Sequence, residues 1–147
     1  MMLSSLLRVL NLSNFEDLLL YDNDLKVQIP IAIRNVSDLK WLCLGDNLFS
    51  GHLPSTMFDH LSKLQSLDFH NNNLFGRIPT NIFKCQELEF LSLGWNDLEG
   101  SLPQEIGNLT KLIHLHLDMN NLTAIVPSKV SSQGGLETSD GIWTLAT

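Results

Sequence analysis

The side chains in this sequence that are best suited to chemistry are histidines and aspartates spaced two positions apart. His114, His116 and Asp118 alternate in one stretch, and Asp68 and His70 alternate in another. If each stretch is a β-strand, its alternate residues share one face, where imidazole and carboxylate groups can bind a metal or transfer protons. Alternate residues on a strand stand roughly 7 Å apart, however, which is wide for joint ligation of one ion. We therefore expect no metal site, no cofactor and no catalytic residue.

Composition and motifs argue against several other functions. The sequence has no kinase, hydrolase, P-loop or HExxH signature. Cys43 and Cys85 are too few for a disulfide framework and lack the spacing of a zinc site. A net charge of -7 argues against nucleic acid as a partner, because phosphates are bound by clustered Lys and Arg. We expect Cys85 to lie in the core and Cys43 to be an outward-pointing free thiol.

The elements that must position these side chains are repeats of 24 or 25 residues. The five prolines of the chain all stand at one phase, each after an aliphatic residue: Pro30, Pro54, Pro79, Pro103 and Pro127. Seven residues before each proline stands an asparagine: Asn23, Asn47, Asn72, Asn96 and Asn120. Aligned on these markers, the units read LxxLxxLxLxxNxLxGxIP with small departures and start near residues 12, 36, 61, 85 and 109. This periodicity predicts a repeat architecture.

The physical chemistry of the motif predicts an α/β-type solenoid made mostly of β-strands with loops or 3-10 turns. The LxL core alternates inward and outward, as a strand does, and one short strand per repeat would stack into a parallel sheet on the concave face of an arc. The asparagine can satisfy backbone groups where the strand ends, so the five asparagines form a structural ladder. Because one repeat cannot bury its leucines alone, stability must come from stacking.

This repeat resembles the plant-specific class of leucine-rich repeats over residues 12 to 127. That class forms the ectodomains of receptor-like serine/threonine kinases and receptor-like proteins, and also polygalacturonase-inhibiting proteins. The third to fifth units are most similar to a receptor-like kinase ectodomain. The resemblance implies a place on the extracellular side of the plasma membrane, ligand perception in defence or development, and a leucine-rich-repeat co-receptor as a further partner.

The ends of the chain depart from the repeat. We interpret residues 1–11 as a degenerate remnant of an earlier repeat, residues 12–130 as five leucine-rich repeats, and residues 131–147 as a non-repeat tail. The cysteine-bearing caps usual in the family are missing, no signal peptide is evident, and no stretch approaches the ~20 apolar residues of a membrane span. These features leave open a truncated gene product without a function of its own, and they weigh against a secreted inhibitor of the polygalacturonase-inhibiting type.

The outward residues of the predicted strands form a candidate ligand-binding surface. Seven of the chain's ten aspartates fall at these concave positions, and none of its nine Lys and Arg does. Aromatic side chains lie among them, and aromatic anchors among polar residues are typical of protein interfaces. The alternative is that polar outward residues only keep the sheet soluble. The candidate ligand-binding residues are Tyr21, Trp41, Asp46, Asp68, His70, Phe90, Trp95, Asp97, His116 and Asp118.

These residues favour a non-catalytic binding module over an enzyme. An acidic, aromatic groove suits a peptide or protein ligand that is basic or neutral. The basic pair that some peptide receptors of the family use to hold a ligand carboxylate has no counterpart here, so that binding mode is not expected. Four Asn-x-Ser/Thr sequons are candidate glycosylation sites: Asn11, Asn35, Asn108 and Asn121.

Overall fold

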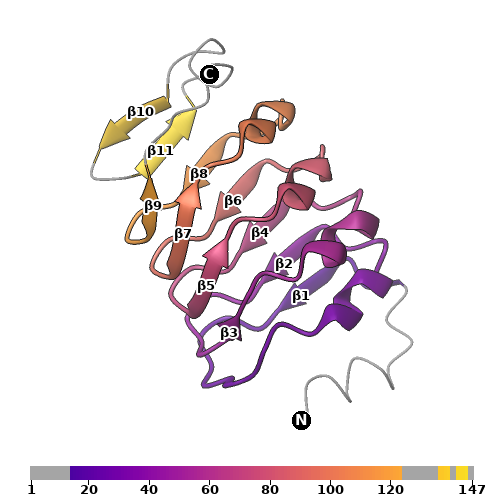
Figure 1. Cartoon of the computed structure of the whole chain (residues 1–147). Helices are drawn as coiled ribbons and strands as arrows, with labels where there is room; N and C mark the ends of the chain where they lie inside the picture. The colour runs from indigo at the N-terminus through magenta and orange to yellow at the C-terminus, as the bar shows by residue number, and fades with distance from the viewer. Residues whose placement is uncertain (1–13, 124–135, 140–141, 146–147) are drawn as a thin grey trace.

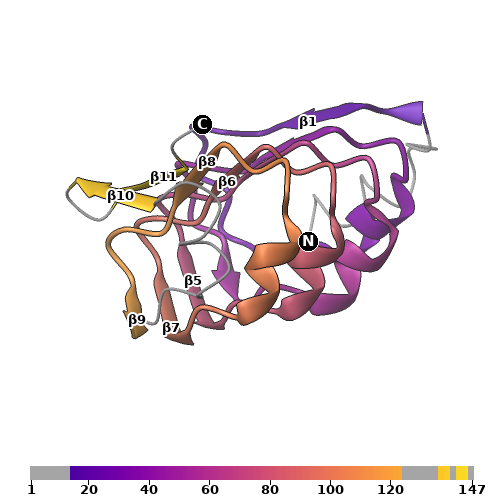
Figure 2. The ribbon, with the colours of Figure 1, turned by 90° about the horizontal axis from the view of Figure 1, so that it is seen from above.

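A computed structural model describes residues 14–123, 136–139 and 142–145 of the 147-residue chain (Figure 1). Over residues 14–123 the chain winds through successive repeats, and each repeat adds one strand to the same sheet. Figure 2 shows the coil from above, with this main sheet along one side and a second sheet and short helices along the other two. The predicted solenoid of strands and 3-10 turns is confirmed.

The main sheet is built from the LxL segments of the repeats. Its five parallel strands, in sheet order, are β1 (Asp17–Leu19), β2 (Trp41–Cys43), β4 (Ser66–Asp68), β6 (Phe90–Ser92) and β8 (His114–His116). Equivalent residues of neighbouring repeats pair directly, so the central leucine of each strand lies beside the next. One row of leucines points inward, and the residues on either side of it point outward.

The tail adds two antiparallel strands to this sheet, which the sequence did not predict. β11 (Ile142–Leu145) pairs antiparallel with β8, with Trp143 in register with Leu115, and β10 (Leu136–Ser139) pairs antiparallel with β11. The main sheet therefore has seven strands, of which the first five are parallel.

A second, four-stranded parallel sheet follows the asparagines of the second to fifth repeats and was also not predicted. Its strands are β3 (Ser50–Gly51), β5 (Asn73–Arg77), β7 (Asp97–Ser101) and β9 (Asn121–Thr123). The glycine of the motif has a specific role here. Gly76 has a φ of +84°, and a Cβ at this position would collide with the ring of His52. The motif glycine therefore permits both the left-handed backbone and the close approach of the neighbouring repeat.

Short 3-10 helices form the third side of the coil, and each begins directly after a motif proline. They are η2 (Ile31–Asn35), η3 (Ser55–His60), η4 (Thr80–Lys84) and η5 (Gln104–Asn108). The proline has no N–H to satisfy and holds φ near its fixed value, so it enters the turn without losing a sheet hydrogen bond.

None of the helices in the part of the chain that the structure describes is long and apolar enough to cross a membrane.

The core runs along the inside of the coil and consists of the motif leucines with large side chains from the other two sides. Leu42, Leu67 and Leu115 are fully buried. Phenylalanines fill the space between the layers. Phe58 and Phe83 come from the helices η3 and η4, Phe69 directly follows β4 of the main sheet, and Phe49 directly precedes β3 of the second sheet. Cys85 is 1 % exposed, and burial raises the pKa of its thiol to about 12, so its predicted place in the core is confirmed.

The asparagine ladder ties each repeat to the one before it. The amide nitrogen of Asn72 donates hydrogen bonds to the carbonyl oxygens of Leu44 (3.1 Å), Phe69 (3.2 Å) and His70 (3.1 Å). Its amide oxygen accepts the backbone N–H of Phe49 at 2.9 Å. Asn47, Asn96 and Asn120 repeat this pattern with their own neighbours. Asn23 is exposed, and its side-chain amide donates to the carbonyl oxygens of Leu20 (3.2 Å) and Tyr21 (2.9 Å) of its own repeat.

Candidate ligand-binding face

The outward residues of β1, β2, β4, β6 and β8 form two rows across the main sheet, which we call the binding face. The strand register places Asp17, Trp41, Ser66, Phe90 and His114 in one row, and Leu19, Cys43, Asp68, Ser92 and His116 in the other. Sequence alternation thus assigned these outward positions correctly for Trp41, Asp68, Phe90 and His116. Ser92 shares the face but is only 5 % exposed, so it is covered by its neighbours.

The aromatic side chains of the binding face lie at two places. Trp41 is exposed on β2. Across β6 and β8, the ring centroid of Phe90 lies 6.0 Å from that of His114 and 5.5 Å from that of His116. The two imidazoles are 6.3 Å apart, with their planes tilted. The alternating histidines therefore extend an aromatic patch around Phe90, and sequence reasoning did not include His114 in the site.

The other histidine of the site bridges two aspartates from different repeats. His70 Nδ1 lies 2.8 Å from Asp68 Oδ1, and His70 Nε2 lies 3.0 Å from Asp46 Oδ2. The ring fits because Gly45 lies beneath it, and a Cβ on Gly45 would collide with it. Burial lowers the pKa of His70, but the hydrogen bonds and negative charges of Asp68 and Asp46 outweigh burial and leave the pKa raised. A hydrogen bond from Asn71 (2.7 Å) does most to lower the pKa of Asp46.

The two histidine groups are therefore separate. His70 belongs to an acidic cluster in the second and third repeats, whereas His114 and His116 belong to the aromatic patch near the end of the parallel strands. Within the described residues, no group of three or more His, Cys, Asp or Glu side chains is placed to hold a metal ion. The Cys43 thiol is half-buried among these residues, and burial, together with the nearby Asp68 and Asp17, raises its pKa.

A second set of site residues lies in the turn that follows each main-sheet strand, directly before the ladder asparagine. All have a positive φ of 50° to 56°, and together we call them the turn ridge: Asp22, Asp46, Asn71, Trp95 and Met119. Tyr21 precedes the ridge and is 60 % exposed, and Trp95 is 56 % exposed. The sequence pattern identified Trp95 and Asp46 as outward but gave no sign of their left-handed backbone. Met119 was not among the candidates.

Two aspartates of the candidate set need separate comment. Asp97 does not lie on the binding face: it follows the ladder asparagine and begins β7, so it belongs to the second sheet, in register with Phe75. The sequence analysis continued the inward and outward alternation of the main-sheet strand past the turn, but the chain changes sheets at that turn. Asp118 is half-buried next to the ridge, and a Cβ on Gly94 would lie 2.7 Å from its Oδ1. Glycine at that position therefore makes room for the carboxylate.

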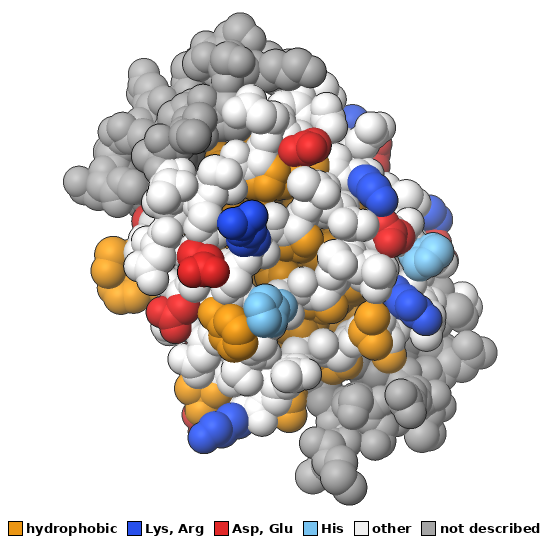
Figure 3. All heavy atoms as spheres, in the orientation of Figure 1, with side chains coloured by type: hydrophobic (Ala, Val, Ile, Leu, Met, Phe, Trp, Pro, Cys, Tyr) orange, Lys and Arg blue, Asp and Glu red, His pale blue; other side chains and the backbone are white. Residues whose placement is uncertain are grey.

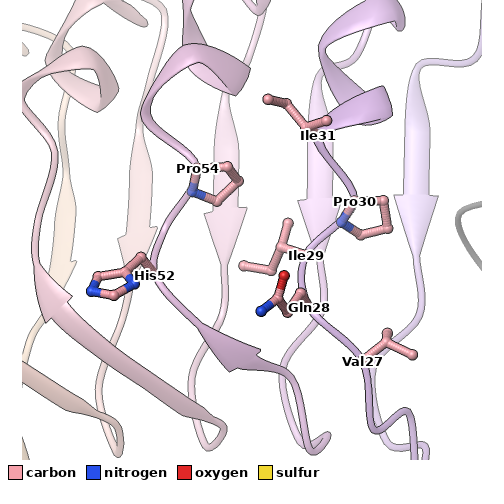
Figure 4. Close-up of a pocket in the computed structure, with 7 residues that line it drawn as sticks. All are labelled: Val27, Gln28, Ile29, Pro30, Ile31, His52 and Pro54. Atoms are coloured by element: carbon pink, nitrogen blue, oxygen red, sulfur yellow. The ribbon is translucent and has the colours of Figure 1, made fainter.

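The surface of the first three repeats has two hollows, one beside the ridge and one beside the second sheet. The first, of about 370 Å³, is lined by residues of the ridge and ladder of the first three repeats and by the residues that follow two of the ladder asparagines: Asp22, Asn23, Asp24, Asp46, Asn47, Leu48 and Asn71. The second, of about 700 Å³, lies between the first two repeats beside the second sheet (Figure 4). Gln28 and Ile29 point there from the first repeat toward the segment of His52 and Pro54. The remaining lining residues are Val27, Pro30 and Ile31.

Charge is divided between the faces. Within residues 14–123, the binding face and the ridge contain aspartates but neither Lys nor Arg. Lysines elsewhere pair with acids of the preceding repeat: Lys40 with Glu16, Lys63 with Asp38, Lys84 with Asp59, and Lys111 with Glu87. Figure 3 shows the opposite situation over β3, β5 and β7, where basic and acidic side chains lie together. The binding face is therefore distinct in carrying charge of one sign.

The described sequons lie away from the binding face. Asn35 and Asn108 are exposed at the last positions of η2 and η5, and Asn121 is exposed on β9 of the second sheet. Asn11 lies outside the described residues, as does the interpretation of residues 1–11 as a repeat remnant. A glycan on any of the three described asparagines would leave the binding face open.

Comparison with known proteins agrees with this architecture. Residues 63–85 and 87–109 match the Leucine Rich Repeat family. Receptor like protein 24 of Arabidopsis thaliana is 45 % identical over 106 residues, which are 71 % of this chain and 12 % of that protein. Receptor-like protein 52 of the same plant is 33 % identical over 116 residues, or 79 % of this chain and 11 % of that protein. The chain thus spans about a tenth of the length of these relatives.

Solved structures give the same picture at the level of the fold. The plant peptide hormone receptor RGFR1, in complex with RGF2, is 30 % identical with a TM-score of 0.78 over 81 % of this chain and 19 % of that one. A chain of the BIR3–SERK2 complex from Arabidopsis thaliana is 36 % identical with a TM-score of 0.74, covering 80 % of this chain and 63 % of that one. The repeats described above are therefore similar to part of the ectodomains in these complexes.

Proposed function

We propose that this chain, a leucine-rich-repeat protein that resembles part of a plant receptor ectodomain, is a non-catalytic module that binds a peptide or protein ligand on its binding face. The observation that carries the proposal is the combination of exposed aromatic side chains with aspartates, and with neither Lys nor Arg, on one side of the sheet. Trp41 is 46 % exposed there, and large exposed aromatic groups on a rigid sheet are suited to anchoring a partner.

The size and charge of the face define the ligand. Strands in such a sheet lie ~4.8 Å apart, so five span roughly 20 Å, and an extended peptide rising ~3.3 Å per residue would place about six residues across them. Because the binding face carries aspartates but neither Lys nor Arg, the ligand is basic or neutral, with at least one apolar side chain. The aromatics supply affinity, and the aspartates mainly raise the association rate.

The setting of this binding follows from the resemblance. We infer that the chain belongs to a receptor-like protein or receptor-like kinase on the extracellular side of the plasma membrane and takes part in ligand perception in defence or development. One similar structure is a peptide hormone receptor in complex with RGF2, and another is a complex of BIR3 with SERK2. These neighbours support a peptide or protein ligand and a leucine-rich-repeat co-receptor as partners.

The test is a binding titration on the full chain with matched aromatic variants. Trp41 on the binding face and Phe75 on the second sheet are 46 % and 45 % exposed, so each loses a similar surface when replaced by Ala. With a six-residue peptide containing Lys and Leu, we expect Trp41→Ala to weaken binding about tenfold or more, and Phe75→Ala to change it less than about twofold. Binding should also weaken at high salt. Equal effects of the two variants, or preferential binding of an acidic peptide, would contradict the proposal.

A further inference from the structure

The turn ridge holds two large apolar residues in a backbone conformation that suits them poorly. Asp22, Asp46 and Asn71 are residue types that adopt a positive φ readily, because a short polar side chain can hydrogen-bond locally. Trp95 (φ 56°) and Met119 (φ 52°) have no such side chain. Two neighbouring repeats thus keep apolar side chains where the rest of the ridge has Asp or Asn, which indicates a role other than folding.

These two side chains are also exposed at equivalent positions of neighbouring repeats. Trp95 is 56 % exposed and Met119 is 60 % exposed, and neither belongs to the buried core. Their backbones are adjacent, because the N–H of Trp95 donates to the carbonyl of Asp118 (2.9 Å) and the N–H of Asn96 donates to the carbonyl of Met119 (3.2 Å). Equivalent positions of adjacent repeats lie ~4.8 Å apart, so an indole and a thioether at that spacing can share one ligand side chain.

The opposite end of the ridge has the complementary chemistry. There, Asp22 and Asp46 line the hollow of about 370 Å³. Asn71 donates to one oxygen of Asp46, and His70 lies 3.0 Å from the other, so the orientation of this carboxylate is fixed. The ridge therefore changes from acidic in the first two repeats to apolar in the last two, with Asn71 between them.

We propose that the turn ridge binds an extended basic peptide in one orientation, with an apolar side chain on Trp95 and Met119 and a Lys or Arg side chain toward Asp46 and Asp22. This inference rests on the proposed function and specifies the chemistry of its ligand. Charge complementarity selects the occupant, because the ridge and the binding face together present aspartates without a Lys or Arg among their described residues.

The geometry also sets the spacing of the two ligand side chains. Asp46 and Trp95 are two repeats apart on the ridge, which is roughly 10 Å at ~4.8 Å per strand, and Met119 is one repeat further. An extended peptide covers that distance in about three or four residues. The ligand segment should therefore carry its cationic and apolar side chains about three or four positions apart, and shorter separations should bind more weakly.

The first experiment separates a binding role of Trp95 and Met119 from a structural one. Trp95→Asn and Met119→Asn introduce the residue type that suits the backbone, so the unfolding temperature should not fall. Affinity for a capped peptide with one Lys and one Leu three residues apart in a Gly/Ser background should fall at least several-fold for each variant. An unchanged affinity in both variants, or a loss of affinity that is matched by a clear fall in unfolding temperature, would overturn the inference.

The second experiment tests the orientation on the full chain. A spin label is attached next to either the Leu or the Lys of the same peptide, and paramagnetic broadening of backbone amide signals is measured. The label beside Leu should broaden Met119 more than Asp22, and the label beside Lys should do the reverse. Equal broadening of both ends by each label would overturn the orientation while leaving the proposed function intact if Trp41→Ala still weakens binding. Failure of any basic peptide to bind would instead refute the proposed function.

Discussion

Replacement of Asn72 by Leu tests whether the asparagine ladder holds the repeats together. Leu has nearly the size of Asn but cannot make hydrogen bonds, so the change isolates the polar contacts. Asn72 is 9 % exposed and makes four hydrogen bonds to backbone groups, of which those to Leu44 and Phe49 reach the preceding repeat. Loss of the side chain leaves these backbone groups without their partner in a site that water reaches poorly.

The magnitude follows from the number of bonds. At about 0.5–1.5 kcal/mol for each hydrogen bond, four bonds correspond to roughly 4 kcal/mol of unfolding free energy, less a small gain from burying the apolar Leu. Asn23 is the matched control, because it occupies the same motif position but is exposed, and its side chain donates two hydrogen bonds to carbonyl groups of its own repeat. Asn23→Leu should therefore cost about 1 kcal/mol or less.

Urea denaturation of the parent and both variants, followed by circular dichroism, measures this difference. We expect the midpoint of Asn72→Leu to fall well below that of Asn23→Leu. If the ladder also couples the repeats, the slope of the Asn72→Leu transition should decrease, because the array then unfolds less cooperatively. Equal midpoints for the two variants would refute the idea that the contacts between repeats, and not the local turn, are what the asparagines stabilise.

Four further predictions follow from the site. Because the pKa of His70 is raised, its contribution to stability is complete below its ordinary pKa of about 6.5 and is lost as the pH rises above that value. His70→Gln should therefore flatten the pH dependence of the thermal midpoint above about pH 6.5. The lowered pKa of Asp46 has the opposite sign, and Asp46→Asn should remove a loss of stability that the parent shows as the pH falls below about 4. Gly45→Ala should destabilise by about 1–3 kcal/mol in thermal unfolding, since its Cβ would displace the His70 ring. A thiol reagent at neutral pH should modify Cys43 slowly and Cys85 only after unfolding, because burial raises the pKa of both thiols.

The main sheet and its outward rows could be predicted because they depend on a strict local pattern. Each LxL segment sets an inward row by alternation, and the spacing of prolines and asparagines aligns the segments. This reasoning placed Trp41, Asp68 and Phe90 on the outward face, where the structure has them. The ladder was predicted from the same spacing.

Features that depend on contacts between repeats could not be predicted from the local sequence pattern. The strands of the second sheet have two to five residues, and glycine occupies an inward position in β5 and β7, so these strands show no run of alternating apolar side chains in the sequence. That is why Asp97 was assigned to the wrong sheet. The bridge from His70 to Asp46 joins residues that are 24 positions apart and depends on the space above Gly45. The antiparallel pairing of β11 with β8 joins the tail to the last repeat and has no counterpart in the repeat pattern.

The most direct test of the central claim is to map where a ligand binds. Backbone amide chemical shifts of the full chain are recorded with and without a saturating basic peptide that contains one apolar residue. The account predicts that the largest changes fall on β2, β4, β6 and β8 and on the turn ridge from Asp46 to Met119. Changes concentrated instead on β5 and β7 of the second sheet, or on the helices η3 and η4, would contradict it.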